Sequence, residues 1–165
     1  MPYPPGVLLR WLPKAAYGIV HEATRHLLKR PVVGIVAVAR TPDGRLLLVR
    51  RADNGMWGLP GGTLEWGETF VTGLGRELDE EAGVVEHEVR RVLGAWSEPM
   101  RDPRFHAVTI GVECAVAPPV KPPKNRLEIL EARLFADADV PARLAFGAED
   151  IVKAAREGPI GGVLE

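Results

Sequence analysis

Apolar runs separated by turn signals divide the chain after residue 30 into predicted strands and helices. Val32–Arg40 is an extended apolar run, and Thr41-Pro42-Asp43-Gly44 separates it from a second run, Arg45–Arg51. Because two β-prone runs joined by a short turn are typical of a hairpin, we predict that these two strands pair. Three more strands are predicted at Glu86–Ser97, Phe105–Val116 and Glu131–Phe135.

Two segments of this region have helical spacing instead. From about Thr69 to Gly83, Leu74, Leu78 and Ala82 recur on one face of a predicted helix, and Ala148–Glu157 is a predicted closing helix. Gly83 suits the left-handed position that ends a helix. Strands mixed with helices indicate the α/β class and a sandwich of layers. The Pro-rich stretch 117–123 is expected to be a surface loop rather than a partner-binding motif.

Residues 1–30 have a pattern of their own. After Pro13, apolar residues recur at helical spacing, which predicts an amphipathic helix: Ala16, Ile19, Val20, Ala23 and Leu27. An apolar stripe has to be covered, so we expect it to pack on its own sheet or on a second subunit in a homodimer. We therefore divide the chain into an N-terminal extension, residues 1–30, and a main domain, residues 31–165.

Composition narrows the classes of function. A chain of 165 residues with a net charge of −1 gives no electrostatic case for binding nucleic acid or a membrane surface. Cys114, the one cysteine, alternates with neighbours in a predicted strand, which favours a buried position over a nucleophile. No apolar stretch is long enough to span a membrane, and the first residues lack the order of a secretion signal. We therefore expect a cytoplasmic protein.

The helix that ends at Gly83 carries a cluster of carboxylates. Glu77 precedes Glu80 and Glu81 by three and four residues, so all three side chains lie on one helix face. Their mutual repulsion makes a divalent cation the natural partner, and carboxylate oxygens favour Mg²⁺, with Mn²⁺ as the alternative. Arg76 could hold one carboxylate in a bidentate pair and so fix its rotamer. A solvated acidic face is the competing interpretation.

A glycine-rich segment precedes this helix in the chain. Pro60-Gly61-Gly62 is a predicted turn in which the backbone can come close to a ligand. Nine residues follow the spacing G-x5-E-x7-R-E-U-x-E-E-x-G-U, in which U is an apolar residue: Gly62, Glu68, Arg76, Glu77, Leu78, Glu80, Glu81, Gly83 and Val84. This spacing resembles the signature of the Nudix hydrolase family. The resemblance implies an α/β/α sandwich with a mixed β-sheet over about Val32 to Glu157.

The resemblance also implies roles for individual residues. The carbonyl of Gly61 and the carboxylates of Glu77, Glu80 and Glu81 would be metal ligands, with Glu80 or Glu77 doubling as the general base. In many relatives a glutamate from a downstream loop takes part, and Glu128 or Glu131 could supply it. We prefer Glu128 as the catalytic residue, because Glu131 begins a predicted strand. Glu68 would support the loop and the outer shell of the metal.

The sequence is less specific about the substrate. Pro99 lies fifteen residues beyond Val84, an offset that resembles the marker of ADP-ribose and nucleoside-diphosphate-sugar pyrophosphatases. Several side chains could then contact phosphate, ribose or base: Arg51, Arg101, Arg104 and His106, with Trp57 or Trp66 stacking on the base. Surface arginines and tryptophans packed in the core or at its rim are the alternative interpretation.

Together these features predict Mg²⁺-dependent hydrolysis of a phosphoanhydride bond in a nucleoside-diphosphate-linked substrate, giving a nucleoside monophosphate and a sugar phosphate. One alternative is a nucleoside triphosphate pyrophosphohydrolase resembling MutT, which would release pyrophosphate. The other is a domain that binds a nucleotide as a sensor without catalysis. The complete set of glutamates favours an enzyme.

Overall fold

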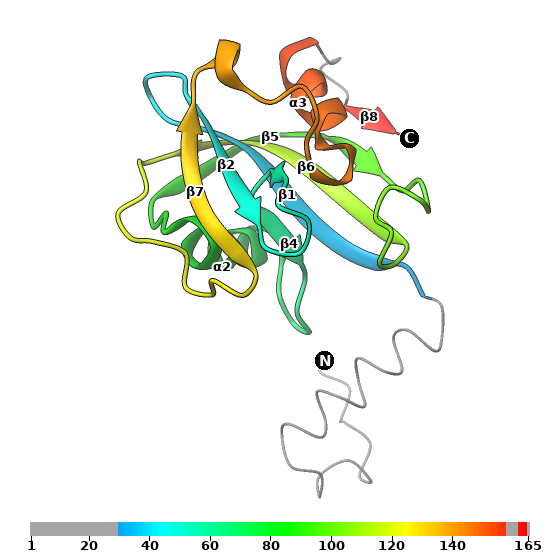
Figure 1. Ribbon diagram of the computed structural model, residues 1–165. Coiled ribbons are helices and arrows are strands. Elements are labelled where there is room, and N and C mark those ends of the chain that lie inside the picture. The colour runs from blue at the N-terminus through cyan, green and yellow to red at the C-terminus, as the bar shows by residue number, and fades with distance from the viewer. Residues whose placement is uncertain (1–29, 158–161, 165) are drawn as a thin grey trace, which may run out of the picture. The chain divides into compact units, whose positions relative to one another are not determined.

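The computed structural model describes residues 30–157 and 162–164 (Figure 1). The predicted N-terminal helix and any dimer contact through it lie outside these residues. From residue 32 on, the described residues belong to one compact unit. Its elements are β1 (Val32–Arg40), β2 (Leu46–Arg51), β3 (Trp57–Gly58), β4 (Gly61–Thr63), α2 (Phe70–Ala82), β5 (His87–Trp96), β6 (Ala107–Val116), β7 (Ile129–Phe135), the 3₁₀ turns η2 (Asp137–Asp139) and η3 (Ala145–Gly147), α3 (Ala148–Glu157) and β8 (Val163–Leu164).

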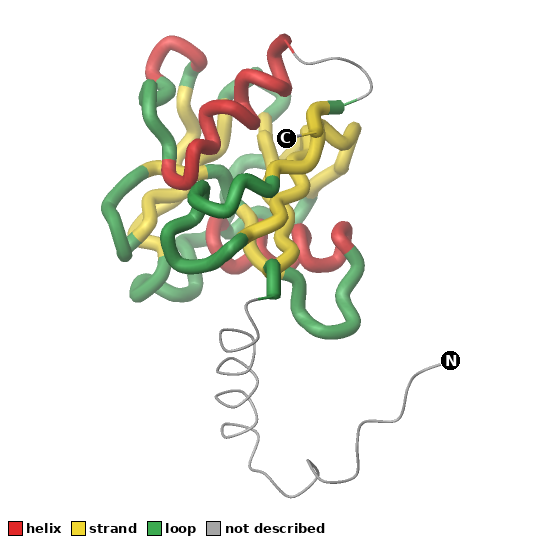
Figure 2. The backbone as a smooth tube through the Cα atoms, turned by 90° about the vertical axis from the view of Figure 1, so that its right-hand side faces the viewer, coloured by secondary structure: helices red, strands yellow, loops and turns green. Residues whose placement is uncertain are grey.

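The strands form one mixed sheet in the order β3-β2-β1-β6-β5-β8, with β4 paired to β1 and β7 paired to β2. Strand β1 runs parallel to β6 and antiparallel to β4, and β5 runs parallel to β8. The 90° turn of Figure 2 shows these strands in yellow with the helices in red. The sheet is therefore mixed, as the sequence analysis predicted.

The predicted pairing of β1 with β2 is observed only next to the turn that joins them. The two strands share the single register pair Arg40–Leu46. Beyond it, β1 pairs with β4 and β6, whereas β2 pairs with β3 and β7. The two strands separate because each finds longer partners elsewhere in the sheet.

Side chains alternate between two cores, one on each face of the sheet. In β1, Ile35, Ala37 and Ala39 belong to the core under α2, whereas Val38 belongs to the core under α3. The α/β/α sandwich is therefore confirmed (Figure 1). Cys114 lies in the α2 core with 1% of its surface exposed, and burial raises the pKa of its thiol to about 11. Its predicted structural position is confirmed.

Helix α2 begins and ends where the sequence predicts. Thr69 caps its start in a reciprocal pair with Thr72, and Gly83 ends it in the left-handed conformation at φ 65°. Leu74 and Leu78 are fully buried against the sheet. This anchoring fixes which way the acidic face of α2 points.

Other predicted boundaries need correction. Strand β7 begins at Ile129, so Glu131 lies inside the strand rather than at its start. The predicted turn at Pro60-Gly61-Gly62 is partly a strand, because β4 pairs with β1 from Gly61 to Thr63. Strands β3 and β8, which have two residues each, were not predicted, since such short segments show no periodicity. No helix within the described part of the chain is long and apolar enough to cross a membrane.

Candidate metal and phosphate site

Two glycines of β4 bring the backbone against the acidic face of α2. A Cβ on Gly61, whose φ is 140°, would lie 2.7 Å from Cα of Val36, so a larger residue does not fit. A Cβ on Gly62 would lie 2.7 Å from Cδ of Glu77. Gly61 therefore lets β4 lie close against β1, and Gly62 lets the β4 backbone approach the carboxylate of Glu77.

Glu81 is a buried carboxyl where β4 meets helix α2. Its side chain is 6% exposed, and its Oε2 accepts a hydrogen bond from the backbone N–H of Gly61 at 2.9 Å. Burial raises the pKa of Glu81 to about 8, and the negative charges of Glu77 and Glu128 add to the rise. The Gly61 hydrogen bond and the charge of Arg51 act in the opposite direction. Glu81 makes no ion pair with any residue that the structure describes.

Arg76 joins three of the carboxylates. It makes a bidentate pair with Glu68 at 2.8 and 3.1 Å, and its Nη1 donates to Oε1 of Glu77 at 2.8 Å. Oε2 of Glu80 lies 3.6 Å from the same Nη1. Arg76 holds the pKa of Glu68 down at about 2, whereas burial raises the pKa of Glu77 in spite of Arg76. The bidentate pair that the sequence predicted for Arg76 is formed with Glu68 rather than with a residue of α2.

The remaining α2 carboxylates differ in exposure and in partners. The side chain of Glu80 is 43% exposed and lies 3.5 Å from Nζ of Lys124. Asp79 pairs with Lys121 at 2.5 Å and with Lys124 at 2.7 Å, so it shares Lys124 with Glu80. Asp79 is therefore an acidic residue of the same helix that pairs with lysines, whereas Glu77 pairs with Arg76 and Glu81 accepts from the N–H of Gly61.

The donor set fits a divalent cation in its chemistry. As they stand, no three acidic, histidine or cysteine side chains among residues 30–157 and 162–164 converge into a closed metal site. Glu77 is turned to Arg76 and Glu81 to the Gly61 N–H. A cation would offset the repulsion and burial that raise the pKa values of Glu77 and Glu81. Glu77, Glu80, Glu81 and the carbonyl of Gly61 are all oxygen donors, which Mg²⁺ prefers.

Glu128 lies beside this cluster and Glu131 does not join it. The carbonyl of Glu128 accepts a hydrogen bond from the N–H of Ala52 at 2.8 Å. The charge of Glu128 contributes to the raised pKa values of Glu77 and Glu81, after burial in each case. Glu131 instead pairs with Arg50 at 2.8 Å. This placement favours Glu128 over Glu131 as the downstream glutamate, and its catalytic role stays a prediction.

Arg51 and Arg104 form a second cluster with two aspartates. Arg51 makes a bidentate pair with Asp53 at 3.0 and 2.8 Å, and Arg104 makes one with Asp102 at 3.0 and 2.8 Å. Nη1 of Arg104 lies 3.7 Å from Oδ2 of Asp53, which links the two pairs. Both guanidinium groups stack on Phe146, at 4.8 Å for Arg51 and 4.6 Å for Arg104. The structure thus brings together two of the predicted phosphate-binding residues.

Three members of this cluster were not predicted from the sequence: Asp53, Asp102 and Phe146. Asp53 and Asp102 each stand two residues from the arginine they bind, a spacing that could have suggested the pairs. Nothing in the sequence near Phe146 signals its contacts, because Arg51 and Arg104 reach it from distant segments.

The other predicted substrate-binding residues are engaged elsewhere. Arg101 donates to the carbonyl of Gly147 at 2.8 Å and pairs with Asp150 at 3.1 Å. His106 shares a hydrogen bond with the carbonyl of Ser97 at 2.8 Å. Trp57 packs edge-on against Phe135 with the ring centroids 4.8 Å apart, and Trp66 is 98% exposed. Their contact with a substrate stays a prediction.

The chain matches the model of the NUDIX domain over residues 28–155. It belongs to the Nudix hydrolase family. An ADP-ribose pyrophosphatase from Methanocaldococcus jannaschii is 34% identical over 137 residues, 77% of this chain and 74% of that protein. A MutT-like protein from Streptomyces ambofaciens is 48% identical over 69 residues, which are 42% of this chain and only 44% of that protein.

Solved structures agree with this assignment. A NUDIX hydrolase from Nitrosomonas europaea superposes with a TM-score of 0.67 at 28% identity, covering 82% of this chain and 77% of that one. The NUDIX domain of NrtR from Shewanella oneidensis, solved in complex with ADP ribose, superposes with a TM-score of 0.64 at 25% identity. That match covers 88% of this chain and 98% of the other.

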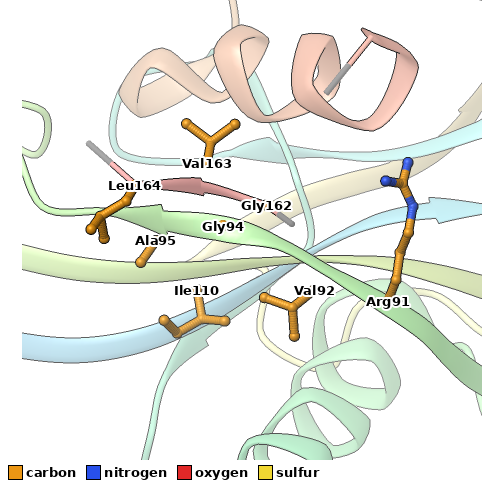
Figure 3. Close-up of a pocket in the computed structure, with 8 residues that line it drawn as sticks. All are labelled: Arg91, Val92, Gly94, Ala95, Ile110, Gly162, Val163 and Leu164. Carbon is orange, nitrogen blue, oxygen red and sulfur yellow. The ribbon is translucent and has the colours of Figure 1, made fainter. Parts of the chain in front are cut away.

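This Nudix domain also has a cavity of about 460 Å³ at the β8 edge of its sheet (Figure 3). It lies between β5 and β8 and is mostly apolar, with Val92, Ile110 and Leu164 in its lining. Arg91, its charged residue, is held by Glu113 at 2.6 Å and by the carbonyl of Ala155 at 2.9 Å. None of the predicted catalytic glutamates lines this cavity, so it is not our candidate for the site of hydrolysis.

Proposed function

We propose that this Nudix protein hydrolyses the phosphoanhydride bond of a nucleoside-diphosphate-linked substrate, ADP-ribose or a nucleoside-diphosphate sugar, with Mg²⁺ as the metal. The observation that carries the proposal is the position of buried Glu81, held by the Gly61 N–H and surrounded by Glu77 and Glu128. An acidic cluster in which burial raises the pKa values of Glu77 and Glu81 is typical of a functional site rather than of a stabilising surface.

Different residues would bind the cation, orient its ligands and accept the proton of water. Glu77, Glu80, Glu81 and the Gly61 carbonyl would hold the cation, and Arg76 with Glu68 would fix the orientation of Glu77. When bound, the cation neutralises the diphosphate and lowers the pKa of water. A carboxylate, Glu77, Glu80 or Glu128, would take the proton from the attacking water. The P–O bond of the anhydride breaks as the new P–O bond forms, giving a nucleoside monophosphate and a sugar phosphate.

Three similar proteins support different choices of substrate. The ADP-ribose pyrophosphatase of M. jannaschii and the ADP ribose bound to the NrtR domain favour the diphosphate-linked class. The local match to a MutT-like protein favours a nucleoside triphosphate as the second candidate. We also propose a cytoplasmic location and keep the homodimer through residues 1–30 as a proposal.

Hydrolysis of ADP-ribose in ¹⁸O-labelled water tests the reaction and locates the attack. Label in AMP identifies attack on the phosphorus that carries adenosine, and label in ribose phosphate identifies attack on the other phosphorus. Glu77→Gln should lower turnover by at least about a hundredfold, whereas Asp79→Asn, on the same helix but paired with Lys121, should stay near wild type. Equal losses in both variants would contradict the assignment of the α2 cluster.

A further inference from the structure

Phe146 has a backbone conformation that its side chain makes unfavourable. It is the one non-glycine residue with a positive φ among those that the structure describes, at φ 57° and ψ 31°. The left-handed conformation is unfavourable for a residue with a Cβ, whereas glycine adopts it readily. A phenylalanine at such a position therefore suggests that its ring is needed there.

The turn is held in place independently of the ring. Nη1 of Arg101 donates to the carbonyl of Gly147 at 2.8 Å and lies 3.4 Å from the carbonyl of Phe146. Gly147 also has a positive φ of 64°, and Asp150 pairs with the same guanidinium group at 3.1 Å. Arg101 thus fixes the backbone that presents the Phe146 ring.

The Phe146 ring contacts two arginines, each of which is paired with an aspartate. The guanidinium groups of Arg51 and Arg104 lie 4.8 and 4.6 Å from its centroid. Both bidentate pairs with aspartate use Nε and Nη2 of the arginine. Nη1 of Arg104 lies 3.7 Å from Oδ2 of Asp53, which is beyond hydrogen-bond distance, so Nη1 of each arginine can still donate to a ligand. The side chain of Arg51 is only 13% exposed, and its position is therefore strongly determined by these contacts.

These arginines lie beside the acidic cluster. The backbone N–H of Ala52, next to Arg51 in the chain, donates to the carbonyl of Glu128 at 2.8 Å, and Nη1 of Arg104 lies 3.7 Å from Oδ2 of Asp53. A diphosphate that reaches the α2 carboxylates through a cation would therefore have two guanidinium groups within reach. Guanidinium groups bind phosphate oxygens strongly because their geometries match.

We infer that Phe146 is a positioning residue, which holds Arg51 and Arg104 together as a clamp for the diphosphate of the substrate. The inference rests on the proposed function, because a diphosphate group is what the clamp binds. Phe146 itself contacts the arginines and not the reacting atoms.

The test compares Phe146→Leu, which keeps an apolar side chain but removes the ring, with Phe105→Leu. Phe105 is the matched control, because it stacks on Arg104 alone at 5.1 Å. With ADP-ribose and Mg²⁺, Phe146→Leu should raise KM about tenfold and change kcat less than about threefold, as expected for loss of two cation–π contacts that act on binding. Phe105→Leu should change KM less than about threefold, and Phe146→Tyr should restore the wild-type value.

A double-mutant cycle separates positioning from a general structural role. If Phe146 acts through the arginines, Phe146→Leu should add little to the KM of Arg104→Gln. Additive effects, equal KM changes in the two Leu variants, or a loss of kcat at unchanged KM would overturn the inference.

If ADP-ribose is not turned over, the clamp is tested by binding of ADP, which is measured by calorimetry in the presence of Mg²⁺. Weaker ADP binding by Phe146→Leu than by Phe105→Leu would support the clamp even if the proposed reaction fails. ADP binding that is absent in the folded wild type, or equal in both variants, would refute the clamp. If Phe146→Leu does not fold, the same comparison is made with Phe146→Tyr and Phe146→Trp, and failure of both to bind ADP as wild type does would refute it as well.

Discussion

Replacing Glu81 by glutamine should stabilise the metal-free protein at high pH while it abolishes activity. Burial raises the pKa of the Glu81 carboxyl from 4.5 to about 8. The folded state therefore binds a proton that the unfolded state has released between these two pH values. The stability that this proton supplies is fully present below pH 4.5 and is lost as the pH rises toward 8.

The size of this loss follows from the two pKa values. At roughly 1.4 kcal/mol per pKa unit, the rise from 4.5 to about 8 corresponds to a loss on the order of 5 kcal/mol above pH 8. For a chain of this length the melting temperature would fall by about 10 to 20 °C over that pH range. Glu81→Gln carries no charge to bury, so it should remove most of this fall.

The assay is thermal unfolding from pH 5 to pH 9 in the presence of a chelator. The matched control is Glu80→Gln, because Glu80 lies on the same helix with its side chain 43% exposed. Glu80→Gln should keep the pH dependence of the wild type, and added Mg²⁺ should raise the melting temperature of the wild type most at high pH. Parallel curves for wild type and Glu81→Gln would refute the reasoning that Glu81 is a buried carboxyl held for a cation.

Three further predictions concern the surroundings of the site. Gly62→Ala should lower turnover by at least about tenfold with an unchanged far-ultraviolet circular dichroism spectrum, because its Cβ would lie 2.7 Å from Cδ of Glu77; normal turnover would contradict this packing. Thr69→Ala should destabilise the protein by about 1 kcal/mol in urea unfolding, since it removes the reciprocal cap with Thr72, and Thr69→Ser should recover most of that loss. Cys114, with its thiol pKa raised to about 11 by burial, should react with a thiol reagent only in unfolding conditions; rapid labelling of the native protein would show that it is not buried.

Elements with a strong local pattern could be predicted from the sequence. Helix α2 has an apolar stripe, a capping threonine and a terminal glycine, and its predicted ends agree with the structure. Helix α3 spans Ala148–Glu157 as predicted. The pairing of strands depends on partners far apart in the sequence, so the sequence did not show that β1 leaves β2 after Arg40–Leu46.

The acidic cluster could be predicted from local spacing in the sequence, whereas the arginine cluster could not. Glu77, Glu80 and Glu81 share one helix, so helical geometry alone places them on one face. Arg51, Arg104 and Phe146 come from three segments that only the fold brings together. The sequence could therefore suggest each arginine as a phosphate ligand but not the ring that joins them.

The most direct measurement of the central claim is a Mg²⁺-dependent hydrolysis screen over ADP-ribose, nucleoside-diphosphate sugars, dinucleoside polyphosphates and nucleoside triphosphates, with products separated by chromatography. Our account predicts AMP and ribose phosphate from ADP-ribose, or the corresponding monophosphate and sugar phosphate from another diphosphate-linked substrate, and no product with Glu81→Gln. Pyrophosphate released from triphosphates alone would contradict the proposed substrate class, and no turnover by folded protein supplied with Mg²⁺ would contradict the proposed enzyme.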